Sequence, residues 1–172
     1  AACIATPPGH YFDGSDDIRC TAGRFSASGS SSLEGCEVCR GGTYSEEGAT
    51  YCLTASAGEK IAFNADNLRV GLTECLANSY SIGANDNCLP CKEGSHSEPG
   101  QAACVSTPPG LYYDGIRDVN CPAGTFSSTG ASSLEACEPC AEGFYSKAGF
   151  GYCSPCEAGT FASSDQTSCI NC

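Results

Sequence analysis

The sequence predicts a small disulfide-rich fold, built of tandem cysteine-rich loops with short β-hairpins and almost no helix. The chain has 16 cysteines in 172 residues, whereas leucine, isoleucine, valine and phenylalanine together account for only 25. So few large apolar residues cannot bury enough surface to offset the entropy lost on folding. Small secreted proteins with weak cores replace burial by covalent cross-links, and an even number of cysteines permits complete pairing.

The cysteine content also predicts the compartment. Cytosolic thiols are kept reduced, so we expect a secreted protein of the extracellular surface or matrix. The formal net charge of -12 and only 8 basic residues argue against a nucleic-acid partner, because phosphates bind clustered lysine and arginine. No apolar run approaches the roughly 18 residues of a membrane span. The chain starts with Ala1 and contains no methionine, so we expect no signal peptide in it and a processed or partial polypeptide.

An internal duplication organises the chain into two eight-cysteine repeats. Residues 2–52 align with 103–153 at a constant offset of 101, with 29 of 51 positions identical. The spacing Cys75-x12-Cys88-x2-Cys91 recurs as Cys156-x12-Cys169-x2-Cys172. We therefore expect a first repeat at 1–103, with an insertion at 53–74, and a second repeat at 104–172 that is cut in mid-pattern at its C-terminus.

A smaller repeat lies within each half, in loops that open with the pattern Cys-x-x-Gly-x-aromatic-Ser or a close variant of it. The third position is glycine, or asparagine at Asn78, which predicts a turn with positive φ. The fifth position carries a ring, His96 in one loop, so we expect a small satellite core of rings against the disulfides. The sixth position is serine except at Ala162, so the hydroxyl helps the turn without being essential.

Secondary structure is expected to be sparse, with two or three residues of strand on each side of a turn. The stretches Ser31–Glu34 and Ser132–Glu135 fit capping boxes and predict one helical turn before Cys36 and Cys137. The insertion predicts a longer hairpin, from Lys60–Phe63 across 64–67 to alternating residues from Leu68. Either its free edge adds to another chain or it is a decorated surface loop.

Two disulfide schemes are compatible with the cysteine order, since eight cysteines allow 105 connectivities. Closing each loop on itself leaves Cys3 and Cys172 as partners across a junction between successive units. The rival scheme crosses the first cysteine of each group of four to the third and the second to the fourth. The loop-closing pairs are Cys20–Cys36, Cys39–Cys52, Cys75–Cys88, Cys91–Cys104, Cys121–Cys137, Cys140–Cys153 and Cys156–Cys169.

The sequence gives little support for metal binding or catalysis. The cysteines at 153, 156, 169 and 172 have zinc-site spacing, but cysteines elsewhere occur singly, which favours disulfides. Asp13, Ser15 and Asp17 alternate like calcium ligands, yet Ile116 breaks the pattern in the duplicate, so we expect turn residues. Catalytic motifs are missing from the sequence, and we expect a non-enzymatic protein without cofactor or metal.

The two Thr-Pro-Pro segments are candidate attachment points for O-linked sugar, and their alternative role is that of stiff turns. They comprise Thr6, Pro7 and Pro8, and Thr107, Pro108 and Pro109. Asn-linked sugar is not expected, because the chain has no Asn-x-Ser/Thr sequon.

The motif CPAGTFSSTGASSLEACEPCAEGFYS, followed by CSPCEAGTF, resembles the ephrin-receptor-like cysteine-rich repeat, which is similar to growth-factor-receptor and tumour-necrosis-factor-receptor modules. The resemblance covers nearly all of the chain except 53–74. It implies an elongated, loop-rich rod with a ladder of disulfides. Such repeats occur in surface and matrix proteins and in receptor ectodomains. We expect a structural repeat of a coat, fibre or flagellar-hair-like filament, joined to copies of itself or further repeats and carrying glycans; the alternative is a ligand-binding receptor ectodomain.

Overall fold

The structure is a computed structural model that describes residues 5–172, and within them it consists of ten antiparallel two-stranded hairpins. Loops this short leave room for only a few residues of strand. Two compact units are present: the first extends to Pro90 and includes Glu98–Ala103, and the second comprises Cys91–Ser97 and Cys104–Cys172. This division lies close to the boundary between the two sequence repeats, at residues 103 and 104. It differs from that boundary because strand β11 (Ser95–His96) pairs across it with strand β12 (Val105–Ser106).

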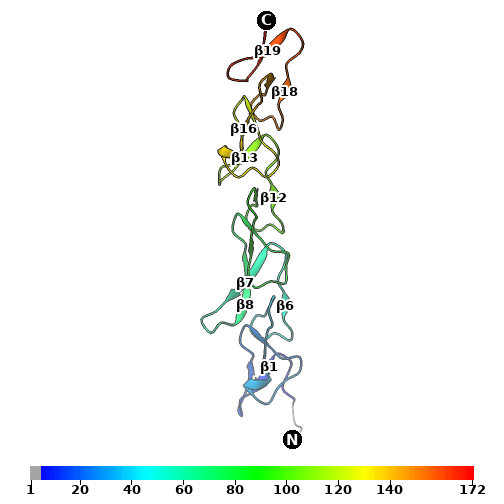
Figure 1. The fold of residues 1–172 in the computed structure, drawn as a ribbon. Helices are drawn as coiled ribbons and strands as arrows, with labels where there is room; N and C mark the ends of the chain where they lie inside the picture. Colours follow the sequence, from blue (N-terminus) through cyan, green and yellow to red (C-terminus); the bar gives the residue numbers. More distant parts are fainter. Residues whose placement is uncertain (1–4) are drawn as a thin grey trace. The chain divides into compact units, whose positions relative to one another are not determined.

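In the first unit, strands pair in sequence order (Figure 1): β1 (His10–Phe12) with β2 (Asp17–Arg19), β3 (Arg24–Phe25) with β4 (Glu37–Val38), β5 (Thr43–Tyr44) with β6 (Leu53–Thr54), β7 (Glu59–Phe63) with β8 (Arg69–Glu74), and β9 (Ser79–Tyr80) with β10 (Leu89–Pro90). In the second unit they are β11 (Ser95–His96) with β12 (Val105–Ser106), β13 (Leu111–Tyr113) with β14 (Asp118–Asn120), β15 (Thr125–Phe126) with β16 (Glu138–Pro139), β17 (Phe144–Tyr145) with β18 (Ser154–Pro155), and β19 (Thr160–Ala162) with β20 (Cys169–Asn171).

All ten hairpins follow one plan, and we call each a module, named by its opening residue. Three residues after the opening residue the backbone has positive φ, and the first strand follows directly. The predicted left-handed turn is confirmed at all seven cysteine-opened modules, Asn78 included. The same turn occurs at Gly9, Gly58 and Gly110, in modules that open with Thr6, Ala55 and Thr107. The repeat is therefore defined by its glycine turn and does not require cysteine.

Seven disulfides close the seven cysteine-opened modules in the described chain, each linking the opening cysteine to the cysteine just before or at the start of the second strand. They are Cys20–Cys36, Cys39–Cys52, Cys75–Cys88, Cys91–Cys104, Cys121–Cys137, Cys140–Cys153 and Cys156–Cys169. These are the pairs of the loop-closing scheme and not those of the crossed scheme. Cys172 is free and exposed, and Cys3 lies outside the described residues.

The segment at 53–74, expected to be an insertion with a hairpin, follows the plan of the other modules. Leu53 and Thr54 complete the preceding hairpin as β6, and Ala55 opens a module of its own. The longer hairpin predicted there is confirmed, with β7 and β8 joined across a turn in which Asn67 has φ 59°. The edge of β8 is partly occupied, since the Ser45 amide donates to the Arg69 carbonyl at 3.2 Å.

Cystine and serine form the buried interior, and the rings do not. Among residues 5–172 the buried apolar residues are six cysteines with Ala55, Ile61 and Ala131. Six of the sixth-position serines are buried as well: Ser26, Ser45, Ser81, Ser97, Ser127 and Ser146. The fifth-position rings are half-buried, and Phe161 is exposed. The prediction that the aromatic rings form a small core is therefore wrong, because in these small loops the rings stay partly exposed to solvent.

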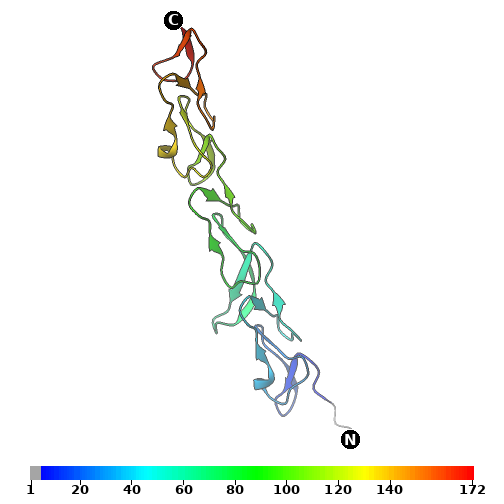
Figure 2. The same cartoon turned by 45° about the vertical axis from the view of Figure 1, so that its right-hand side comes forward.

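Two single helical turns occur where they were expected, as the 3-10 helices η1 (Leu33–Gly35) and η2 (Leu134–Ala136). Each lies beside the hairpin of the preceding module, η1 beside β1 and η2 beside β13 (Figure 2). The predicted capping boxes are absent: neither cap serine, Ser32 nor Ser133, makes a side-chain cap hydrogen bond. Instead the Ser133 hydroxyl hydrogen-bonds the Glu135 carboxylate and lowers its pKa.

Candidate functional site

The most regular feature of the molecule is the contact by which successive modules dock. Within each compact unit, the amide of an opening residue donates to the carbonyl of the turn glycine in the preceding module. Cys20 donates to Gly9 at 2.8 Å and Ala55 to Gly42 at 2.9 Å. Cysteine, alanine and threonine make this bond alike, because it uses only the backbone.

A second docking contact joins six modules to the one two places further along. A Cβ built on Gly94 would lie 1.9 Å from the Gly130 carbonyl oxygen, and one built on Gly58 would lie 1.9 Å from the Gly100 carbonyl oxygen. Gly9, Gly42, Gly110 and Gly124 approach carbonyl oxygens in the same way. Glycine is thus required twice at these turns, for its positive φ and for the close approach of the neighbouring backbone.

The buried serine adds a third docking contact. The hydroxyls of Ser45, Ser127 and Ser146 donate to the carbonyl of the residue that follows the turn glycine in the preceding module, at 2.8, 2.8 and 2.7 Å. Burial of a hydroxyl is tolerated because it is paired. Sequence reasoning assigned this serine to its own turn, whereas at these three positions it connects two modules.

The same backbone docking contact occurs at Cys172. The Cys172 amide donates to the Gly159 carbonyl at 3.1 Å, so Cys172 stands in the position of an opening cysteine. A Cβ on Gly143 or on Gly159 would meet no atom within 4 Å. Cys172 therefore presents a thiol at the position where seven other modules begin their disulfide.

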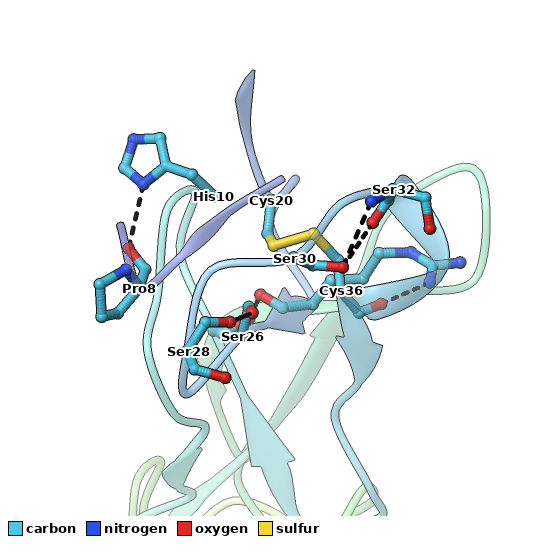
Figure 3. Close-up of a disulfide and its surroundings, with 10 residues drawn as sticks. Pro8, His10, Cys20, Ser26, Ser28, Ser30, Ser32 and Cys36 are labelled. Atoms are coloured by element: carbon cyan, nitrogen blue, oxygen red, sulfur yellow. Dashed lines mark hydrogen bonds between the residues drawn. A yellow bond between two sulfur atoms is a disulfide. The ribbon is translucent and has the colours of Figure 1, made fainter. Parts of the chain in front are cut away.

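The two Thr-Pro-Pro segments form the glycine turns of modules without cysteine. Pro7 and Pro8 are exposed and Thr6 is half-buried. Figure 3 shows the His10 ring beside this turn, with Nδ1 3.0 Å from the Pro8 carbonyl oxygen, to which it donates when protonated there. The nearby Ser30 hydroxyl donates to the Ser32 carbonyl at 3.0 Å.

Thr107 differs from Thr6 because it is fully buried, whereas Pro108 and Pro109 are exposed. It occupies the place of an opening cysteine, and the strand register puts Asp118 in the place of that cysteine's partner. Because the Thr107 hydroxyl is buried in the folded chain, it is not accessible to a glycosyltransferase, contrary to the expected sugar site. Threonine and aspartate thus stand where the cysteine-opened modules have a disulfide.

His96 packs as an aromatic residue, as expected from its place in the repeat. Its ring stacks on Tyr113 with centroids 4.5 Å apart and planes 1° from parallel. Its Nδ1 atom lies 3.7 Å from Asp118 Oδ1. This stack joins the Cys91 module to the Thr107 module.

One ion pair was not foreseen from the sequence. Arg69 in β8 contacts Asp86 through Nη2–Oδ2 at 2.6 Å and Nε–Oδ1 at 3.1 Å, and its Nη1 donates to the Cys39 carbonyl at 3.2 Å. Asp86 Oδ1 also accepts the Gly42 amide at 2.7 Å. The pair therefore fastens the Ala55 module to the modules on either side of it.

We expect Asp86→Asn to destabilise the first compact unit and to weaken its dependence on acid. Hydrogen bonding from Arg69, more than that from the Gly42 amide, holds the pKa of Asp86 below its ordinary value of 3.8. The stabilisation is therefore complete above the unfolded pKa and is lost as pH falls through the lower folded pKa. The loss near neutral pH should be about 1–3 kcal/mol.

The measurement is thermal unfolding between pH 2 and 7, followed by near-ultraviolet circular dichroism of the tyrosines. Asp66→Asn makes the same charge change in the turn between β7 and β8 and serves as the matched control. It should leave the acid dependence of the melting temperature intact. If the Asp86→Asn chain has the same melting temperature as the unaltered chain throughout this pH range, the ion pair contributes nothing to stability.

Asp13 stabilises a turn, as predicted. Its carboxylate accepts hydrogen bonds from the backbone amides of Ser15 and Asp16 at 2.8 and 2.9 Å. The Asp114 carboxylate does the same in the duplicate, and these backbone bonds lower the pKa of both groups. No group of three or more histidine, cysteine or acidic residues in the described part of the chain is placed to hold a metal ion.

One open hollow, of about 350 Å³, lies against Glu46, Glu47 and Tyr51 in the Cys39 module. The duplicate has Lys147 and Ala148 in place of the two glutamates. A charged site at this hollow is therefore not a shared property of the repeat.

Comparison with known proteins does not assign the chain to a family: no family model matches it, and no curated protein is significantly similar to it. Helices long and apolar enough to cross a membrane do not occur among residues 5–172. The disulfide content is typical of a secreted or extracellular protein.

Proposed function

We propose that the chain is a non-enzymatic extracellular structural repeat, a building unit of a surface coat, fibre or flagellar-hair-like filament. The observation that carries the proposal is the recurrence of the same backbone docking contacts from module to module. A chain built this way can be extended by adding modules, because each new module buries the same groups as the one before it. The resemblance to ephrin-receptor-like repeats supports the same class of protein.

Self-association through the chain ends is part of this proposal. Cys172 is exposed in the position of an opening cysteine. In the sequence repeat Cys3 corresponds to Cys104, which closes such a loop. A disulfide between Cys172 of one copy and Cys3 of the next would join copies covalently, and further repeats of the same chain are the alternative partner.

We expect the chain, when secreted into an oxidising compartment, to form multimers that resist non-reducing electrophoresis and collapse to monomers on reduction. Negative-stain images should show regular fibres. Cys172→Ser and Cys3→Ser should each abolish the covalent ladder, whereas Ser164→Ala, an exposed hydroxyl in the same Cys156 module, should not. Discrete monomers of the unaltered chain in both assays would refute self-association, and a ladder that survives Cys172→Ser would refute this joint.

Glycosylation is proposed at the exposed Thr-Pro-Pro turns. The candidate positions are Thr6, Pro7, Pro8, Pro108 and Pro109, the prolines after hydroxylation. Sugar there would add bulk to an acidic surface without disturbing the buried cystines. The intact mass of native material should exceed the mass of the unmodified chain. An intact mass equal to that of the unmodified chain would refute glycosylation.

A ligand-binding receptor ectodomain is the second candidate function. The observation that favours it is the exposure of large apolar side chains in the Cys75 module, where Leu76 is 77% and Ile82 is 72% exposed. Large exposed apolar side chains are common in protein-binding surfaces. The double substitution Leu76→Ser and Ile82→Ser should then abolish partner binding and leave fibre formation unchanged. Unaltered partner binding by this double variant would contradict a receptor function for this surface.

A further inference from the structure

We propose that the three modules without a disulfide are extensible segments, which lengthen under tension while the disulfide-closed modules keep their length. The Thr6, Ala55 and Thr107 modules are the three. The proposal rests on the proposed structural function for its physiological use, since a coat or fibre is what would be pulled along its chain. Its test uses isolated chains, so it does not depend on fibre formation.

The covalent path sets which parts of the chain carry load. Tension that enters a closed module at one cysteine leaves through its partner, so the residues inside the loop are bypassed. The Cα atoms joined by the seven bridges are already only 5.6–5.8 Å apart. Two residues link Cys36 to Cys39, and two link Cys153 to Cys156. Such stretches have almost no length to release.

The disulfide-free modules are where length is stored. There are 22 residues between Cys52 and Cys75, 16 between Cys104 and Cys121, and 19 before Cys20. A chain extends by at most about 3.3–3.6 Å per residue. The Ala55 module can therefore release a contour of up to roughly 80 Å and the Thr107 module up to roughly 60 Å, less the folded distance between their flanking cysteines.

The hairpin geometry makes this release easy and reversible. Glu59, the first residue of β7, pairs with Glu74, the last residue of β8. Leu111 and Asn120 are likewise the paired outer residues of β13 and β14. Because both pulled ends lie at the same end of the hairpin, its backbone hydrogen bonds are loaded one after another and not together. Each hairpin thus unzips from its open end and can close again from its turn.

Two of the three segments, the Ala55 and Thr107 modules, each have a non-covalent latch. The Ala55 module is held by Arg69, whose guanidinium contacts the Asp86 carboxylate and the Cys39 carbonyl. The Thr107 module is held by the stack of Tyr113 on His96. A change at one latch should alter one release step and leave the other as an internal control (β8, which carries Arg69, and β13, which carries Tyr113, are labelled in Figure 1).

The experiment is single-molecule pulling of the oxidised full chain between handles at its two ends. We expect discrete low-force steps for these modules that refold on relaxation, followed by no further extension. Two of the steps should equal contours of about 80 Å and about 60 Å less the folded distance between the flanking cysteines. Asp86→Asn should lower the force of the longer step alone. Adding a reductant should release, for each disulfide opened, a further loop whose two cysteines are separated in sequence by 13 or 16.

Covalent locking supplies the matched variants. By the strand register, Ala55 and Leu72 stand where Cys75 and Cys88 stand in the next module. Ala55→Cys with Leu72→Cys should remove the longer step only, and Thr107→Cys with Asp118→Cys should remove the shorter step only, once peptide mapping verifies each new bridge. An oxidised chain that does not lengthen before the handles fail, or that releases more length than the disulfide-free segments contain, would overturn the proposal.

Discussion

Gly94→Ala is expected to destabilise the second compact unit severely, by about 2–5 kcal/mol. Part of the cost, about 1–2 kcal/mol, comes from placing an L-residue at φ +72°. The rest comes from the new methyl group, which would lie 1.9 Å from the Gly130 carbonyl oxygen and within 2.8 Å of two more atoms of that residue. Overpacking of this kind costs about 1–3 kcal/mol when the surroundings shift. The backbone must therefore move, and the docking of the Cys121 module on the Cys91 module should loosen.

Gly143→Ala is the matched control, because this turn has φ +83° but no atom within 4 Å of the added methyl group. It should show only the backbone cost of about 1–2 kcal/mol. Urea unfolding of both variants, followed by tyrosine circular dichroism and by amide hydrogen exchange of residues 127–131, separates the two effects. Equal destabilisation by the two substitutions would contradict the view that module docking depends on glycine for close approach.

Removal of a buried disulfide is expected to have the second large effect. Cys20→Ala with Cys36→Ala opens a bridge whose two half-cystines are both completely buried. The loss of loop closure should cost about 3 kcal/mol. Loss of the sulfur atoms from the interior should add about 1–3 kcal/mol, because cystine supplies much of the core and a cavity would remain.

Cys156→Ala with Cys169→Ala is the comparison that isolates the packing contribution. Its loop spans 13 residues against 16, a difference that hardly changes the closure entropy, and its half-cystines are only half-buried. Melting temperatures of the two variants should therefore fall by different amounts, with the buried pair losing more. Equal shifts would mean that the bridges act only on the unfolded chain and contribute nothing through packing.

Local backbone features could be predicted because they depend on few neighbours. Glycine or asparagine three residues after each opening cysteine predicted a left-handed turn, and Asn78 adopts φ 62°. The hairpin across 64–67 was predicted from its alternation and its asparagine-rich turn. Asp13 and Asp114 were recognised as turn residues because only one copy kept the spacing of metal ligands.

The cysteine pattern predicted only those modules that open with cysteine. Thr6, Ala55 and Thr107 open modules without cysteine, and glycine three residues later is the signal that would have found them. The segment at 53–74 was interpreted as an insertion for the same reason. The rings were expected in the core because aromatic residues usually bury most area, but the buried residues of these loops are cystine and mostly small side chains.

The sequence by itself determined the oxidised, loop-rich character of this protein, its duplication and its turns, since composition and short-range spacing control each of these. Only the tertiary structure decided which groups meet across modules. It placed Thr107 in a buried cysteine position, left Cys172 exposed, brought Arg69 to Asp86, and set the turn glycines against carbonyl oxygens two modules away. Those contacts join residues far apart in the chain, and their partners are selected by how folded modules stack, which no single loop encodes.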